Sequence, residues 1–160
     1  MNKSEFRKKY ITLRNNLDKN YVNEASNSIS ESVIQYIDTY IKKYDPKELY
    51  IYGYMPLGNE VSLVKVFDGI WENNLGHNGV SIYTAFPKIE SRTMKFYFAN
   101  SYDNFEPGHF GVTEPKKDCK LCDVKNPLVL VPGVAFSKSC YRMGYGLSLI
   151  HISEPTRRTP

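Results

Sequence analysis

The sequence predicts an α/β fold in which an open, mainly parallel sheet is flanked by helices in three layers. Three observations lead to this prediction. Apolar residues recur at helical spacing in the first part of the chain, short apolar and aromatic runs bounded by proline and glycine follow, and an amphipathic segment separates two of these runs. Apolar strands in strand, helix, strand order are typical of parallel sheets. At 160 residues, the chain has the length of a single domain.

Three segments have helical periodicity. The first runs from Lys3 to about Asn16, and the second from about Asn23 to Tyr44, where Pro46 ends it. A third follows from Val61 to about Asn74. These segments predict the helices of the fold.

Four strands are predicted from apolar runs between turn residues. They cover residues 49–55, 80–86, 94–99 and 128–131. We expect Pro87 to end the second strand, because proline has no N–H to donate to a sheet. A hairpin-like insertion is predicted around 87–100, and a long loop rich in glycine and proline from 101 to 126.

Composition favours a protein that binds small anions. The formal net charge is +4, with 21 basic and 17 acidic residues spread along the chain, whereas nucleic-acid binding usually needs a clustered basic patch. The N-terminus leads into no apolar segment, and no run of about 18 apolar residues occurs, so we expect no membrane segment and a cytoplasmic location. Cys119, Cys122 and Cys140 form an odd and sparse set, which argues against a disulfide framework. Cys119 and Cys122 make a CxxC that could bind metal or act in redox chemistry, but further ligands are irregularly spaced, and we interpret these residues as loop cysteines.

Cations lie beside the apolar stripe of the first helix. At about 100° per residue, Lys3, Arg7 and Arg14 fall close together, whereas Lys8 and Lys9 point elsewhere. The three side chains could bind an anion, or they could extend their aliphatic stems over the margin of the core.

Two further candidates follow predicted strands, where ligands bind in open α/β sheets. Glu60 comes after the first strand at a helix start, where it could bind a ligand or interact with the helix dipole. Arg142 to Gly146 come after the fourth strand, and their glycines would let backbone N–H groups reach phosphate oxygens beside a guanidinium. Alone, this pattern also occurs in glycine-rich turns.

The order of these motifs is more specific than any one of them. Lys3 and Arg7 come first, and Tyr54 to Glu60 (YMPLGNE), Gly108 to Pro115 (GHFGVTEP), Leu130 to Phe136 (LVPGVAF) and Arg142 to Gly146 (RMGYG) follow. This order resembles the 5-formyltetrahydrofolate cyclo-ligase family, also called methenyltetrahydrofolate synthetases. The resemblance covers residues 1 to 146, and it implies the layering that these enzymes share with sugar isomerases.

The resemblance implies that 5-formyltetrahydrofolate and ATP are converted to 5,10-methenyltetrahydrofolate, ADP and phosphate, with magnesium. It also implies that Lys3 and Arg7 hold ATP phosphates, that Arg142 is catalytic, and that Met55 and Glu60 contact the folate. The remaining ATP-binding residues implied by the family motif are Met143, Gly144, Tyr145 and Gly146. We further expect a monomer that binds neither nucleic acid nor membrane.

The sequence departs from the family pattern after Gly146. The family continues with glycine, two aromatic residues and an aspartate associated with magnesium, whereas Leu147 to Arg157 read LSLIHISEPTR. This string matches one translated frame of a transposase-type sequencing adapter. We therefore expect residues 1–146 to form one C-terminally incomplete domain that lacks the magnesium aspartate, residues 147–160 to be a non-native tail, and the chain as written to be inactive.

Two other functions fit parts of the sequence. An ATP-independent enzyme related to sugar-phosphate isomerases or CoA-transferases would also place anion-binding loops after its strands. A nucleotide-binding module without catalysis would agree with the 13 tyrosines and the basic pI. Dependence of turnover on ATP and magnesium separates these alternatives.

Overall fold

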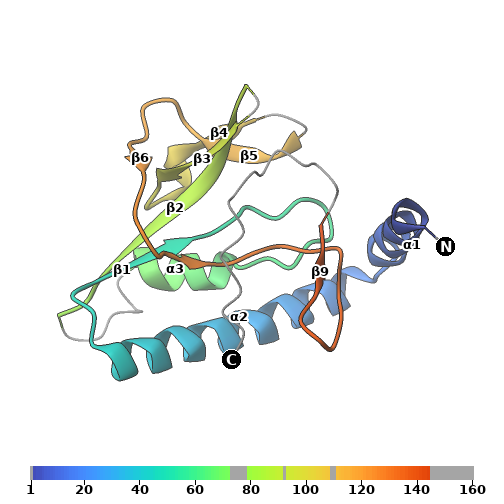
Figure 1. The fold of residues 1–160 in the computed structure, drawn as a ribbon, viewed down its shortest axis with the longest axis horizontal. Coiled ribbons are helices and arrows are strands. Elements are labelled where there is room, and N and C mark those ends of the chain that lie inside the picture. The colour runs from blue at the N-terminus through green and yellow to red at the C-terminus, as the bar shows by residue number, and fades with distance from the viewer. Residues whose placement is uncertain (1, 73–78, 92, 109–110, 145–160) are drawn as a thin grey trace.

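The structure, a computed structural model, describes residues 2–72, 79–91, 93–108 and 111–144. Its helices are α1 (Lys3–Asn15), α2 (Lys19–Tyr44) and α3 (Val64–Trp71), with a 3-10 turn, η1 (Tyr102–Asn104). Its strands are β1 (Glu48–Tyr52), β2 (Ser81–Glu90), β3 (Thr93–Phe98), β4 (Phe105–Pro107), β5 (Thr113–Pro115), β6 (Leu121–Cys122), β7 (Leu128–Val129), β8 (Ala135–Phe136) and β9 (Arg142–Met143). Figure 1 shows their arrangement.

The main sheet has five strands in the order β6-β3-β2-β1-β7. β1 runs parallel to both β2 and β7, while β3 is antiparallel to β2 and to β6. Two small antiparallel pairs, β4 with β5 and β8 with β9, complete the fold. The predicted α/β class, with a mostly parallel sheet flanked by helices, is confirmed.

The two faces of the sheet are covered differently. Alternate residues of β1 point to opposite faces, so that Leu49 and Ile51 pack toward α2 and α3, and Tyr50 and Tyr52 point the other way. The α2 and α3 side forms the larger buried cluster, with these members: Ile37, Ile41, Leu49, Ile51, Tyr54, Leu63, Val66, Phe67, Ile70, Phe86 and Ala99. The opposite face consists mainly of aromatic residues from strands, including a stacked pair of Tyr52 and Phe96 at 4.1 Å.

The helices differ from the prediction at their ends. α2 begins at Lys19, four residues earlier than expected, because the Asp18 carboxylate accepts hydrogen bonds from the N–H groups of Asn20 and Tyr21 at 2.9 and 3.3 Å. This is an N-cap, which satisfies N–H groups that have no partner within the helix. α3 begins at Val64, three residues later than predicted, because residues 61–63 form no regular secondary structure.

The prediction that Pro87 ends the second strand is wrong. β2 continues to Glu90, and Pro87 pairs with Phe96 of β3. β1 pairs with β2 only as far as Ala85, so Pro87 lies where one edge of β2 has no parallel neighbour. A proline is tolerated on such an edge because no ladder hydrogen bond is required of it there.

The predicted loop from 101 to 126 is also wrong in part, because it contains η1, β4, β5 and β6. These strands have only two or three residues each, which is too short for a sequence pattern to reveal. β7 likewise covers only half of the predicted strand at 128–131, and the β8–β9 hairpin was not predicted. Within the described ranges, no helix is both long and apolar enough to cross a membrane.

Candidate active site

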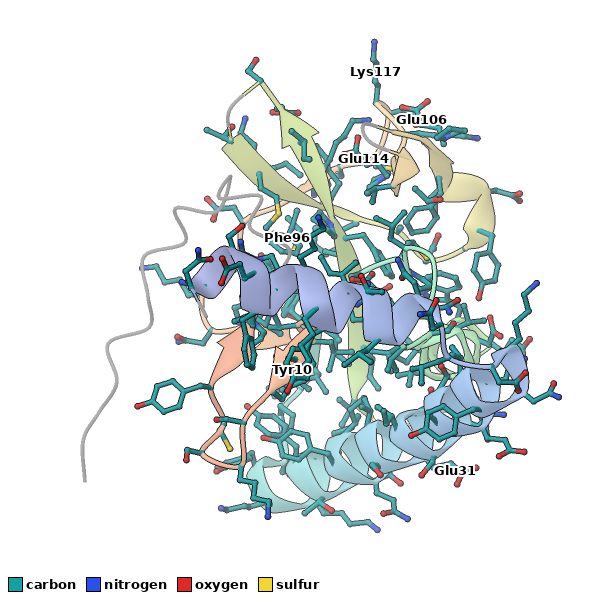
Figure 2. All side chains as sticks on the ribbon, turned by 90° about the vertical axis from the view of Figure 1, so that its right-hand side faces the viewer. Tyr10, Glu31, Phe96, Glu106, Glu114 and Lys117 are labelled. Carbon is teal, nitrogen blue, oxygen red and sulfur yellow. The ribbon has the colours of Figure 1, made fainter. Side chains whose placement is uncertain are left out.

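Helix α1 is held to the protein by polar contacts. None of its residues is buried, although its N-terminus is well formed by a capping box between Asn2 and Glu5. Figure 1 shows α1 at one side of the molecule beside β9, and Figure 2 looks onto it from that side. The polar contacts of α1 are with the loops after β1 and β7 and with the residue after β9, and its apolar residues Phe6, Tyr10 and Ile11 are half-buried.

Arg7 connects α1 to the predicted phosphate-binding segment. Its Nε donates to the carbonyl oxygen of Gly144 at 2.9 Å, across 137 residues of sequence. Lys3 is exposed one helical turn before Arg7, on the same side of α1. The structure thus brings the N-terminal cations next to the glycine that follows Arg142 and Met143.

Glu60 is buried at the end of a tight turn after β1. Gly58 occupies the left-handed region at φ +57°, and the chain folds back so that Glu60 Oε2 accepts a hydrogen bond from the Leu57 N–H at 2.9 Å. Glu60 Oε1 forms an ion pair with Arg14 Nη1 at 3.8 Å. The preceding residue, Asn59, donates to backbone carbonyls at the end of α1, including that of Arg14 at 3.2 Å.

Glu60 and Tyr54 line a cavity of about 200 Å³ whose other walls are mostly apolar. The walls come from α2, the segment before α3, the segment between β7 and β8, and β8 itself: Ile29, Val33, Val61, Leu63, Leu130, Val131, Pro132, Gly133 and Phe136. A mostly apolar hollow with a few polar groups is the usual form of a small-molecule site.

Gly133 joins the cavity to Arg142. A Cβ atom at Gly133 would lie 2.5 Å from Phe136 Cζ and 3.0 Å from Arg142 Cγ, so the absence of a side chain lets both residues approach the backbone closely. The Arg142 guanidinium in turn donates from Nη1 to the Pro132 carbonyl at 2.9 Å. The cation predicted to be catalytic therefore packs against the segment that lines the Glu60 cavity.

Burial dominates the electrostatics of this cavity. It raises the pKa of Glu60, although the Leu57 N–H and the Arg14 guanidinium both act to lower it. Burial, assisted by the nearby Glu60, also raises the pKa of the Tyr54 hydroxyl to about 12, and this hydroxyl donates to the Val61 carbonyl at 2.8 Å. Tyr54 is therefore a neutral hydroxyl at physiological pH.

The predicted site residues fall into three groups. Lys3, Arg7, Arg142, Met143 and Gly144 lie on α1 and β9 or directly after it, and Glu60 lies in the cavity. Met55 packs against the main core instead of lining the cavity. Tyr145 and Gly146 lie outside the described residues, as do two residues of the GHFGVTEP motif, 109 and 110.

Sequence reasoning missed Tyr54 and Gly133 as parts of the site. Both belong to motifs that were recognised, but the spacing of residues in a loop does not predict where each side chain points. The close packing of Gly133 could have been suspected from the proline before it, since a Pro-Gly pair indicates a tight backbone path.

The residues fit phosphate groups better than a metal ion. Arg7, Arg142 and the exposed Lys3 offer cationic groups near a glycine backbone, which suits phosphate oxygens. In contrast, no three acidic, histidine or cysteine side chains cluster among the described residues in a way that could hold a metal. A larger hollow of about 760 Å³ lies elsewhere, lined by residues such as Trp71, Tyr83 and Cys119, and contains none of the predicted site residues.

Comparisons with known proteins identify the fold. The NMR structure of 5,10-methenyltetrahydrofolate synthetase from Aquifex aeolicus is similar with a TM-score of 0.65 and 28% identity, over 91% of this chain and 68% of that one. The synthetase from Mycoplasma pneumoniae matches in fold with a TM-score of 0.62 and 24% identity, over 100% of this chain and 82% of that one. Neither a family model nor a curated protein matches the sequence. In its fold and in the order of its motifs, the chain is similar to 5,10-methenyltetrahydrofolate synthetases, the 5-formyltetrahydrofolate cyclo-ligases.

Proposed function

We propose that this protein catalyses the ATP-dependent conversion of 5-formyltetrahydrofolate to 5,10-methenyltetrahydrofolate, with release of ADP and phosphate. One observation carries the proposal. Gly133 lines the cavity that contains Glu60 and packs against Arg142, so a carboxylate for the folate and a cation for phosphate lie on two sides of one backbone segment. A reaction that joins a phosphoryl group to a folate atom needs this adjacency.

The chemistry requires a leaving group, because a formamide oxygen departs poorly. In the proposed reaction, the formyl oxygen attacks the γ-phosphorus of ATP and ADP leaves. N10 then attacks the activated formyl carbon and gives up its proton to solvent, and the bond from that carbon to the phosphorylated oxygen breaks to release phosphate. Phosphoryl transfer depends mostly on positioning and charge neutralisation.

The protein's own groups can supply this positioning. Lys3, Arg7 and Arg142 would neutralise phosphate charge, and the backbone at Gly144 would lie against the phosphates. Glu60, as an anion, would accept hydrogen bonds from N–H groups of the folate. Magnesium would supply further charge neutralisation, but the described residues do not form a site for it.

The test is turnover measured by the absorbance of methenyltetrahydrofolate, with and without ATP and magnesium. Two proteins are compared: the 160-residue chain, and a chimera in which residues 147–160 are replaced by the segment that follows the aligned residues of the Aquifex aeolicus synthetase. We expect the chimera to need both ATP and magnesium. Turnover without ATP would favour an isomerase-like or transferase-like enzyme, and a chimera that folds and binds ATP but does not turn over would contradict the proposal.

We also propose that residues 1–146 act as one domain and that the protein is a cytoplasmic monomer. The single main sheet, to which strands from residue 48 to residue 129 contribute, supports the first statement. The second follows from the sequence and stays a prediction, which analytical ultracentrifugation and cell fractionation would check.

A further inference from the structure

We propose that Arg14 is a positioning residue that holds the Glu60 carboxylate in its anionic form against the cavity and connects it to the segment carrying Gly133. This inference rests on the proposed function, because it assigns Arg14 a role in binding the reduced folate. Arg14 lies outside the cavity and contacts two residues that line it.

The turn after β1 holds Arg14 at two points. Asn59 donates to its backbone carbonyl at 3.2 Å, and Glu60 faces its guanidinium, with 3.8 Å between Nη1 and Oε1. Consecutive residues of one turn therefore fix both the backbone and the side chain of Arg14. A cation that only extended its stem over the core margin would not be fixed in this way.

The guanidinium also reaches the far wall of the cavity. Arg14 Nη1 lies 3.5 Å from the Gly133 carbonyl oxygen, at the long end of the hydrogen-bonding range. The same nitrogen thus bridges the turn that carries Glu60 and the segment that packs against Arg142. Through these contacts, the position of the carboxylate is tied to the position of the phosphate-binding side.

Glu60 needs such a partner because it is buried. Its side chain is 7% exposed and that of Arg14 is 11% exposed. Among the described residues, the groups that act on Glu60 or are affected by it are the Leu57 N–H from its own turn, the Arg14 guanidinium from α1 and the Tyr54 hydroxyl from the segment after β1. The Leu57 N–H and the Arg14 guanidinium both favour the ionised carboxyl, and the N–H has the larger effect. Arg14 is the one of these groups that carries a full charge at neutral pH and that a side-chain substitution can remove.

The inference is tested by titrating the Glu60 carboxyl by ¹³C NMR in the unmutated chain and in Arg14→Gln, Arg14→Lys and Lys8→Gln. The last variant is the matched control, since Lys8 is an exposed cation on the same helix. We expect the pKa of Glu60 to rise in Arg14→Gln, to stay close to its original value in Arg14→Lys, and to be unchanged in Lys8→Gln. Binding of 5-formyltetrahydrofolate at neutral pH should weaken about tenfold or more in Arg14→Gln, the size expected for losing a contact to a charged group.

A purely structural role would give a different pattern. If Arg14→Gln lowers the melting temperature but leaves the pKa of Glu60 and the pH dependence of folate binding unchanged, the inference is wrong. Should Arg14→Gln not fold, the guanidinium ¹⁵N signals of Arg14 in the unmutated chain decide the question. They should shift with the titration of Glu60, and signals that stay constant through that titration would overturn the inference.

The NMR titration also separates this inference from the proposed function. If the unmutated protein does not bind 5-formyltetrahydrofolate, the proposed function fails, and with it the assigned role in folate binding. The effect of Arg14 on the pKa of Glu60 would still be measured. If the folate binds but Arg14→Gln changes neither affinity nor pKa, only the inference fails.

Discussion

Helices α1 and α2 are neighbours in sequence, but they are attached to the protein in opposite ways. α2 buries Ile37 and Ile41 in the main core, whereas α1 buries no residue and is held by contacts of Arg7, Arg14 and Asn59. Burial of apolar surface gives most of the free energy that stabilises a fold, while polar contacts of this kind add less but fix direction. The difference predicts that α2 contributes more to stability, although its Ile29 and Val33 also line the cavity, and that α1 contributes mainly charged groups to the proposed site.

The largest expected effect comes from the core. Ile37 is 1% exposed, so Ile37→Ala should lower the free energy of unfolding by about 2–5 kcal/mol. Leu13 on α1 is 52% exposed, and Leu13→Ala should change it by no more than about 0.5 kcal/mol. Chemical denaturation of both variants measures this, and equal losses would break the distinction between the two helices.

Arg7 tests whether α1 serves the site. In Arg7→Ala, the hydrogen bond to the Gly144 carbonyl and a phosphate-binding charge are both lost, so ATP affinity should fall about tenfold or more. Arg7→Lys should recover part of it, because the charge remains but the geometry of the guanidinium does not. Calorimetric titration with ATP gives the values. The exposed Lys9→Ala serves as control, and a loss there as large as in Arg7→Ala would argue for general charge attraction instead of a defined site.

Asn59 tests the attachment itself. Its amide nitrogen donates to the carbonyls of Arg14 and Asn15 at the end of α1 and of Leu17 just after it. Asn59→Ala should therefore lower the free energy of opening α1 by about 1 kcal/mol. Amide hydrogen exchange should show faster exchange in α1 and unchanged exchange in α2. Asn27→Ala, at an exposed position of α2, should leave both helices unaffected. Faster exchange in both helices would mean that they open together.

The smallest effect concerns the pH dependence of stability. Burial raises the pKa of Glu60 in the folded state above its usual 4.5, so folding favours the neutral carboxyl, and stability is lost as pH rises through the folded pKa. Glu60→Gln cannot ionise. Its free energy of unfolding, compared with that of the unmutated chain, should therefore increase from acidic to neutral pH, as measured by denaturation at several pH values. A constant difference would show that the environment of Glu60 does not disfavour its charge.

The sequence was most informative where periodicity is long. α1 ended within one residue of its predicted end, and β3 within one residue at each end, because several turns or alternations support each of them. The prediction at Pro87 failed because a strand accommodates proline only where its N–H side has no neighbouring strand. Local sequence does not show which strands pair with β2 at that point.

The site was predictable in its parts but not in its connections. Motif order selected Arg7, Glu60 and Arg142 as candidates, and their roles stay predictions. The contact of Arg7 with Gly144 was not predictable, because it depends on how α1 is placed in three dimensions. Met55 shows the limit of transferring a role by motif, because neighbouring residues of a loop can face the core or the cavity and the motif does not distinguish them.

Trp71 gives a way to observe the two hollows separately. It is the only tryptophan of the chain, it packs against Phe67, Phe86 and Tyr102, and its Nε1 donates to Thr84 Oγ1 at 2.8 Å. It lines the larger hollow but not the cavity of Glu60. The fluorescence of Trp71 should therefore change directly when a ligand enters the larger hollow. A change in its emission when a ligand binds at Glu60 would show that this binding alters the core around Trp71.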